Sequence, residues 1–166
     1  YDETFTINVT DVNEAPTVTL GNRLASTPEN GADVKFADIS VTDDGLGTNV
    51  LGLSGADAGA FSIIGNELHF NGSANFEVKA SYDVTVEVSD ATVGGSPDDS
   101  ELLMLTITDV NEQPNAGADQ MVDIAENQGA GTTAATVVAA DPDLGAGNDL
   151  DNAFENVSYA ITAGNE

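Results

Sequence analysis

The hexapeptide Asp-Val-Asn-Glu-x-Pro occurs twice in this chain, at Asp11–Pro16 and again at Asp109–Pro114, beginning 98 residues after the first copy. Each copy follows a run of apolar residues and precedes a Glu-Asn pair, Glu29-Asn30 or Glu126-Asn127. A repeat at this period is typical of tandem arrays built from one kind of domain. We therefore expect three segments: the end of a preceding unit at 1–14, a complete unit at 15–112, and the first half of a following unit at 113–166.

The apolar pattern of the complete unit is that of β-strands. Tyr82, Val84, Val86 and Val88 alternate with polar residues, which is the signature of a strand with one buried face. The pair Gly65-Asn66 separates two short β-rich runs and predicts a hairpin with a two-residue turn.

The remaining strands are predicted at similar spacing, and no helix is expected. The full set comprises Thr17–Leu20, Val34–Thr42 with a bulge, Val50–Leu53, Phe61–Ile64, Leu68–Phe70, Tyr82–Val88 and Leu103–Ile107. Strands are also expected at Thr4–Val9, Thr136–Ala140 and Val157–Ile161. Seven short strands in one unit predict an all-β, Greek-key β-sandwich, flanked by partial units.

The charge of the chain narrows the partners. It has 29 Asp or Glu residues against three Lys or Arg, and its net charge is −26. Such a surface repels nucleic acid and anionic membranes, so neither partner is expected. Divalent cation binding and adaptation to a salty medium both remain compatible with this charge. Only the first accounts for carboxylates that recur at repeat-equivalent positions, and calcium is the hard cation we expect.

Several other classes of function are disfavoured. The chain has no Cys, which excludes disulfides and thiol chemistry, and it has no apolar stretch long enough to cross a membrane. Its single His69 lies in a predicted strand and is expected to be a surface or edge residue. No nucleophile or phosphate-binding motif is present, so no enzyme is predicted. The run Asp141-Pro142-Asp143 lacks the Gly and Glu of an EF-hand loop.

Five motifs in order resemble the cadherin repeat. They are Pro28-Glu29-Asn30, Asp43-Asp44, Ala74-Asn75-Phe76-Glu77, Ser89-Asp90 and the linker Asp109–Pro114. The linker is one residue shorter than the family pattern, Asp43-Asp44 replaces Asp-x-Asp, and Asn75 stands where the family has Asp. These variants resemble the cadherin-like modules of large bacterial surface or secreted proteins. The resemblance implies an extracellular, calcium-stiffened tandem array.

The resemblance also implies a ligand set for each joint between units. At the second joint it comprises Glu29, Asn75, Glu77, the Val110 carbonyl, Asn111, Glu112, Asp141, Asp143 and the Asn148 carbonyl. At the first joint it comprises Asn13, Glu14, Asp43, Asp44, Asn49 and Asp90. The second joint is expected to hold one or two ions, and the first to bind calcium weakly or to be empty. Asn75 is also compatible with a turn cap, and Asp98-Asp99 is expected to form an ordinary turn.

The leading hypothesis is therefore a calcium-binding module that stiffens an extracellular array and mediates adhesion. Its expected partners are calcium ions and other cadherin-like units in cis or in trans. One alternative is a calcium-dependent carbohydrate-binding module of a polysaccharide-degrading system, although the chain has no Trp and only three Tyr for a stacking platform. Cell-surface glycans are a further partner to be tested. A metal-free acidic spacer is the other alternative.

Overall fold

The computed structural model describes residues 1–115, 117–118, 121–133, 135–136 and 139–143. The chain divides into two units, Tyr1–Thr108 and Asp109–Glu166. The unit boundaries expected from the sequence, at 14/15 and 112/113, remain a prediction.

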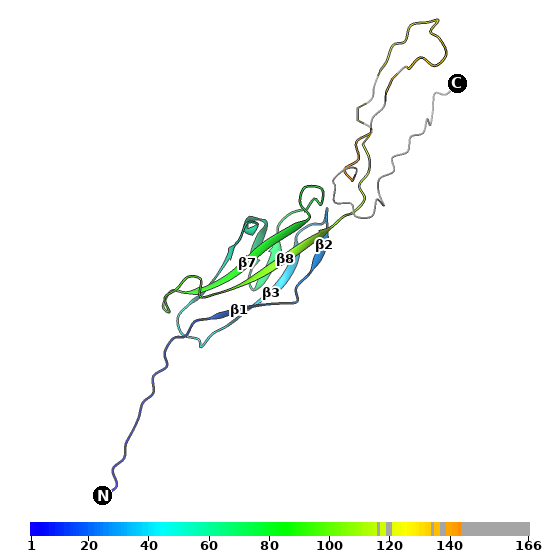
Figure 1. Cartoon of the computed structure of the whole chain (residues 1–166). Helices are drawn as coiled ribbons and strands as arrows, with labels where there is room; N and C mark the ends of the chain where they lie inside the picture. Colours follow the sequence, from blue (N-terminus) through cyan, green and yellow to red (C-terminus); the bar gives the residue numbers. More distant parts are fainter. Residues whose placement is uncertain (116, 119–120, 134, 137–138, 144–166) are drawn as a thin grey trace. The chain divides into compact units, whose positions relative to one another are not determined.

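The first unit is a β-sandwich of two four-stranded sheets (Figure 1). One sheet has the order β1-β3-β6-β5 and the other the order β2-β8-β7-β4. The strands are β1 Thr17–Gly21, β2 Ser26–Pro28, β3 Val34–Thr42, β4 Asn49–Ser54, β5 Phe61–Ile64, β6 Glu67–Phe70, β7 Ser81–Asp90 and β8 Asp99–Thr108, and a 3-10 turn η1 covers Ala58–Ala60. The all-β sandwich expected from the sequence is confirmed.

The strand registers follow the local sequence. The hairpin β5-β6 pairs Phe61 with Phe70 and Ile64 with Glu67, so Gly65-Asn66 forms the predicted two-residue turn. The register between β3 and β6 shifts between Lys35 and Ala37, which confirms the predicted bulge.

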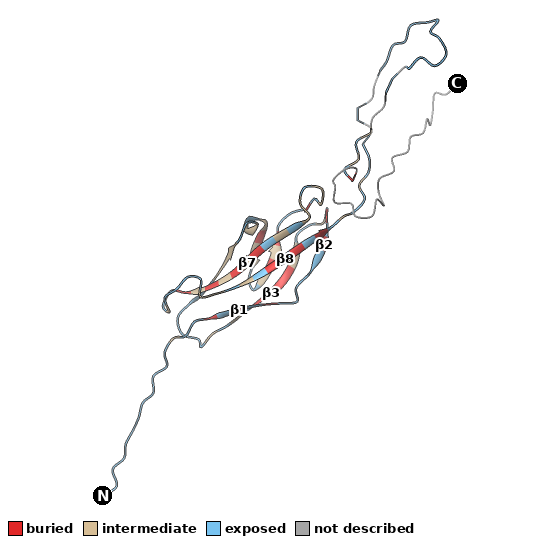
Figure 2. Ribbon diagram, viewed as in Figure 1, coloured by how far each residue is buried: buried red, intermediate tan, exposed pale blue. Residues whose placement is uncertain are grey.

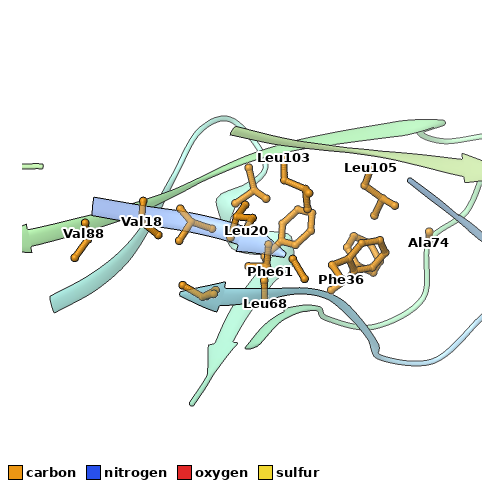
Figure 3. Close-up of a cluster of buried hydrophobic side chains, with 14 of the residues drawn as sticks. Val18, Leu20, Phe36, Phe61, Leu68, Ala74, Val88, Leu103 and Leu105 are labelled. Carbon is orange, nitrogen blue, oxygen red and sulfur yellow. The ribbon is translucent and has the colours of Figure 1, made fainter. Parts of the chain in front are cut away.

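Alternating apolar residues fill the space between the sheets (Figure 2). Val84, Val86 and Val88 of β7 are fully buried, as the period of two predicts. Three Phe rings meet edge to face, with the centroid of Phe36 lying 6.2 Å from that of Phe61 and 6.1 Å from that of Phe70. Figure 3 shows this cluster beside aliphatic side chains of β1 and β8. The core is mainly aliphatic, as the few aromatic residues predicted.

The first unit has eight described strands, where seven were predicted. The additional strand is β2, which pairs in parallel with β8 from Ser26 opposite Thr106 to Pro28 opposite Thr108. The chain leaves one sheet at the end of β1 and enters the other at β2. Three residues are too few to show a period of two, so only the partner strand identifies β2. Pro28 is tolerated there because β2 is an edge strand.

Two acidic side chains of β8 close the free edge of β1. The backbone N–H of Val18 donates to Oδ2 of Asp99 at 2.8 Å, and that of Leu20 donates to Oε2 of Glu101 at 2.6 Å. Arg23 forms an ion pair with Glu101 and donates from Nε to the Leu20 carbonyl at 3.0 Å. The sequence analysis placed Asp99 in an ordinary turn, and this was wrong. Asp99 begins β8, and its carboxylate bridges the two sheets.

Two predicted strands do not appear as strands among the residues that the structure describes. Residues 1–10 carry no strand, and Phe5, Ile7 and Val9 are exposed, as the pale blue N-terminal segment in Figure 2 shows. Within Thr136–Ala140, the described residues 136, 139 and 140 form only an isolated bridge, from Ala140 to Asn115. Alternation marks a segment that is able to pair, but a strand requires a partner ladder. The predicted strand Val157–Ile161 lies outside the described residues.

Membrane insertion was not expected from the sequence. In the part of the chain that the structure describes, no helix combines the length and the hydropathy that a membrane span requires.

Candidate metal centre

Three strand ends and the linker segment bring six predicted ligands to one end of the first unit. Asp43-Asp44 follows β3, Asn49 begins β4, and Asp90 ends β7. We call this set the N-terminal group, and it comprises Asn13, Glu14, Asp43, Asp44, Asn49 and Asp90. Hydrogen bonds join these residues in pairs, Asn13 to Asp90, Glu14 to Asp44 and Asn49 to Asp43, and their role as ligands remains a prediction.

Asp90 is the most buried member of the N-terminal group, with no exposed surface. Its Oδ1 accepts from the backbone N–H of Thr92 at 2.9 Å and from Thr92 Oγ1 at 2.8 Å, and its Oδ2 accepts from Asn13 Nδ2 at 3.1 Å. The Thr92 N–H, then the Asn13 amide and the Thr92 hydroxyl, lower the pKa of Asp90 to about 2. The carboxylate is therefore ionised at neutral pH.

The loop after β3 holds two further carboxylates. Asp44 accepts the backbone N–H of Leu46 at 2.7 Å through Oδ1 and that of Glu14 at 2.9 Å through Oδ2. These two N–H groups lower the pKa of Asp44, while the hydrogen bond between the Glu14 and Asp44 side chains raises the pKa of Glu14. Asp43 accepts from Asn49 Nδ2 at 2.9 Å through Oδ2.

Two oxygens of the N-terminal group are buried without a hydrogen-bond partner. They are Oδ1 of Asn13 and Oδ1 of Asp43. A buried acceptor without a donor costs free energy unless a cation satisfies it. Carboxylate and amide oxygens are the ligands that calcium prefers, so this donor set fits the metal that the sequence predicts.

The opposite end of the first unit carries a second acidic pair. Glu29 follows β2 and is buried, and its Oε2 accepts the backbone N–H of Phe76 at 2.7 Å. A carboxylate oxygen of Glu29 lies within 4.8 Å of one from Glu77. Asn75 is exposed, and its Oδ1 accepts the backbone N–H of Val78 at 2.8 Å, so this oxygen acts as the turn cap that the sequence left open.

The second unit repeats one contact of the first. The backbone N–H of Glu112 donates to Oδ2 of Asp143 at 2.9 Å, which matches the contact from Glu14 to Asp44. Asp143 is 1% exposed, its N–H donates to Oδ1 of Asp141 at 3.2 Å, and its own Oδ1 is buried without a hydrogen-bond partner. A carboxylate oxygen of Glu112 lies within 4.8 Å of one from Asp143.

The remaining predicted ligands are less informative. Asn111 is exposed and its Nδ2 donates to the Glu112 carbonyl at 3.3 Å, and Val110 is also exposed. The predicted Asn148 carbonyl lies outside the described residues.

Sequence reasoning missed three residues around these groups. Asp109 begins the second hexapeptide and has a buried carboxylate oxygen, but only its neighbours were predicted as ligands. Thr92 lies two residues after Asp90, a spacing at which a side chain commonly bonds back to an Asp, and this was the available signal. Asp98 was expected to be an ordinary turn residue, and it does lie in a bend before β8, but its side-chain contact was not foreseen. Its Oδ2 accepts the backbone N–H of Asp90 at 2.5 Å and holds the end of β7.

His69 lies on β6, where the sequence placed it. It is half-buried, and its Nε2 lies 3.1 Å from Oε2 of Glu67.

The comparisons with known proteins agree with this fold. No family model matches the chain. Human Protocadherin alpha-C1 is 33% identical over 153 residues, covering 84% of this chain and 15% of the relative. Protocadherin gamma-C4, from human and from chimpanzee, is 31% identical over 156 residues, covering 84% of this chain. The chain spans 16% of the length of that relative.

Solved structures give the same result. The extracellular domain of Protocadherin GammaB4 has a TM-score of 0.52 at 28% identity, covering 80% of this chain and 22% of that one. Extracellular cadherin domains 1–5 of Protocadherin Gamma B2 have a TM-score of 0.53 at 28% identity, covering 81% and 28%. A third structure, with a TM-score of 0.51 at 25% identity, covers 81% of this chain and 35% of that one, and it is a cis-dimer of Protocadherin gammaB7 EC3-6.

The two-sheet sandwich and its likeness to solved protocadherin ectodomains define an extracellular β-module of the cadherin type. The chain carries a cadherin repeat, and the resemblance found in the sequence is confirmed. The relatives are adhesion proteins rather than enzymes. Cadherin repeats bind calcium as a family, and the acidic groups described above are of the kind that forms such sites.

Proposed function

We propose that this chain is a calcium-binding cadherin module that stiffens a tandem extracellular array and takes part in adhesion, without enzymatic activity. One observation carries the proposal. The linker glutamate of each hexapeptide, Glu14 or Glu112, donates its N–H at 2.9 Å to an aspartate, Asp44 or Asp143. A contact that recurs in both units at repeat-equivalent positions is unlike a chance arrangement of surface acids.

Calcium would give the buried acceptor oxygens of these acidic groups a positively charged partner. It takes six to eight oxygens at flexible geometry, from carboxylates, amide oxygens and backbone carbonyls. The N-terminal group offers carboxylates of Asp43, Asp44 and Asp90 and the amide oxygen of Asn13. When bound, the cation neutralises carboxylates that otherwise repel one another.

The acidic pairs show how large this repulsion is. Glu29 and Glu77 hold carboxylate oxygens within 4.8 Å. Two negative charges at that separation repel by about 3 kcal/mol at an effective dielectric constant of about 20. The pair Glu112 and Asp143 has the same separation limit. A cation at each pair removes this term and adds attraction, so calcium is expected to raise the free energy of unfolding.

For the second joint, the proposal retains the ligands expected from the sequence. These are Glu29, Asn75, Glu77, the Val110 carbonyl, Asn111, Glu112, Asp141, Asp143 and the Asn148 carbonyl, and Asp109 is added to them. The buried Asp143 Oδ1 supports this assignment, since a buried acceptor without a donor is one that a cation satisfies.

Calorimetric titration of the whole chain with calcium tests the metal. We expect saturable heat and a rise in melting temperature at millimolar calcium over chelator, at matched ionic strength, with a smaller effect of magnesium. Asp143→Asn should weaken binding, and Asp83→Asn, on an exposed residue of β7, should not. If calcium produces neither heat nor a melting shift, the chain is the metal-free acidic spacer.

Stiffening and adhesion need separate measurements. Small-angle scattering should give a narrower distribution of chain dimensions in calcium than in chelator. Beads coated with the chain should aggregate in calcium and disperse in chelator if the partner is another copy in trans. Unchanged scattering would remove the stiffening role, and calcium-independent behaviour of the beads would remove adhesion through this module. The comparisons give no support to the glycan-binding alternative.

A further inference from the structure

Thr92 contacts two members of the N-terminal group, although no motif placed it among the ligands. Its hydroxyl donates to Oδ1 of Asp90 at 2.8 Å and accepts from Nδ2 of Asn13 at 2.5 Å. Thr92 lies just beyond the end of β7, and Asn13 belongs to the first hexapeptide. The hydroxyl therefore joins a strand end to the linker segment.

Because the Thr92 hydroxyl has a single hydrogen to donate, it determines which end of the Asn13 side-chain amide faces it. A threonine hydroxyl has one hydrogen, and here Asp90 receives it. Oxygen Oγ1 is then able only to accept from Asn13, so it requires the NH₂ end of the amide. The second hydrogen of Nδ2 is directed to Oδ2 of Asp90 at 3.1 Å. A flipped amide would instead bring Oδ1 against a carboxylate oxygen and a hydroxyl with no hydrogen left to donate.

The opposite end of the same planar amide is the one that calcium would use. With both hydrogens of Nδ2 engaged, Oδ1 points away from Asp90 and Thr92. It is buried and has no hydrogen-bond partner. Asp43 Oδ1 in the same group is also buried without a partner. Two orphaned acceptors in one group are a second indication of a cation site, beyond the presence of acidic residues.

We propose that Thr92 is a positioning residue that aims the Asn13 amide oxygen at the calcium ion of the N-terminal group. This rests on the proposed function, because it presumes that the group binds calcium. Thr92 contributes no ligand atom. Its hydroxyl sets the amide orientation of one ligand, Asn13, and holds one oxygen of another, Asp90. Partners of this kind typically change metal affinity by about 10- to 100-fold when removed.

Thr92→Val tests the proposal, because valine keeps the shape of threonine and removes the hydroxyl. The background is the full chain with Glu77→Gln and Asp143→Asn, so that calcium binding reports on the N-terminal group. We expect Thr92→Val to weaken calcium affinity at least tenfold and Thr92→Ser to restore it. Thr106→Val, at an exposed position of β8, is the matched control and should change nothing.

A spectroscopic readout separates positioning from folding. In chelator, one of the two side-chain NH₂ resonances of Asn13, that of the proton donated to Thr92, should shift in Thr92→Val toward the position of a free amide. The melting temperature should stay close to that of Thr106→Val. Unchanged affinity in Thr92→Val, or failure of Thr92→Ser to restore it, would overturn the role of Thr92 and leave the proposed function standing. Absence of calcium binding in the unmutated chain would overturn both. Binding lost in the background variant alone would overturn only the assignment to the N-terminal group.

Discussion

Removing the carboxylates that close the edge of β1 should destabilise the sandwich more than any surface acid does. In Asp99→Ala the buried Val18 loses the acceptor of its backbone N–H, and in Glu101→Ala the buried Leu20 loses its acceptor. A buried donor left without a partner costs about 1–3 kcal/mol. Against a typical domain stability of about 5–15 kcal/mol, the double variant loses a large share.

Thermal unfolding and amide exchange measure this effect. For a domain of this size, a loss of 1 kcal/mol lowers the melting temperature by roughly 4–8 °C. Asp99→Asn and Glu101→Gln keep an acceptor and should cost less than the alanine variants. Arg23→Gln should cost under about 1 kcal/mol, because its ion pair with Glu101 is partly exposed.

The control is Asp83→Ala, which removes an exposed acid from the neighbouring strand β7. The amides of Val18 and Leu20 should lose exchange protection in the Asp99 and Glu101 variants and keep it in the control. An edge strand whose N–H groups lack partners can pair with a strand of another molecule, so the double variant should self-associate. The alanine variants and the control could instead have the same melting temperature, with the amides of Val18 and Leu20 still protected from exchange. In that case Asp99 and Glu101 do not stabilise the edge of β1.

Two further predictions concern glycine and pH. Gly47→Ala should lower both stability and calcium affinity, because its Cβ would clash with the carboxylate of Asp90 and its φ is +74°. Gly45→Ala, at a φ of +88° with open space, should cost only the backbone strain of about 1–2 kcal/mol. Melting and calcium titration of both variants decide this. The Lys79 ammonium, then the Asp83 N–H, lower the pKa of Asp57 below 3.8. The stabilisation that the Asp57 carboxylate gives the folded state is therefore complete above its ordinary, unfolded-state pKa. This stabilisation is lost as the pH falls through the lower pKa of the folded state. Asp57→Asn should flatten the acid limb of a stability-pH curve, and an unchanged limb would refute the assignment.

Local pattern was sufficient to predict most of the fold. The alternation in β7 and the turn Gly65-Asn66 depend on neighbours in the sequence, and both are in the structure as predicted. The same alternation at Thr4–Val9 predicted a strand that is not formed, because residues 1–10 have no ladder partner. The short β2 was missed for the opposite reason. Its identity comes only from the ladder with β8.

The site was predicted less completely than the fold. Recurrence selected Glu112 and Asp143 as ligands, and these two residues are in contact within their own unit. Their role as ligands remains a prediction. Asp98 and Asp99 were assigned to an ordinary turn, because a pair of acids in a Gly- and Pro-rich segment has that appearance. Asp98 accepts the N–H of Asp90, which lies across the loop between β7 and β8. Asp99 accepts the N–H of Val18, which is 81 residues away in the sequence.

The sequence by itself determined the repeat, the all-β class and the kinds of ligand atom that gather near the linker, since these depend on composition and on periods of two and of about 100 residues. Only the tertiary structure decided which acids lie beside other candidate ligands and which accept hydrogen bonds from a strand edge. Asp90 and Asp99 are the same residue type, yet Asp90 ends a strand beside other candidate ligands and Asp99 faces the open edge of β1. Partners fixed by long-range packing made that difference, because a carboxylate accepts whatever donor the fold places within about 3 Å.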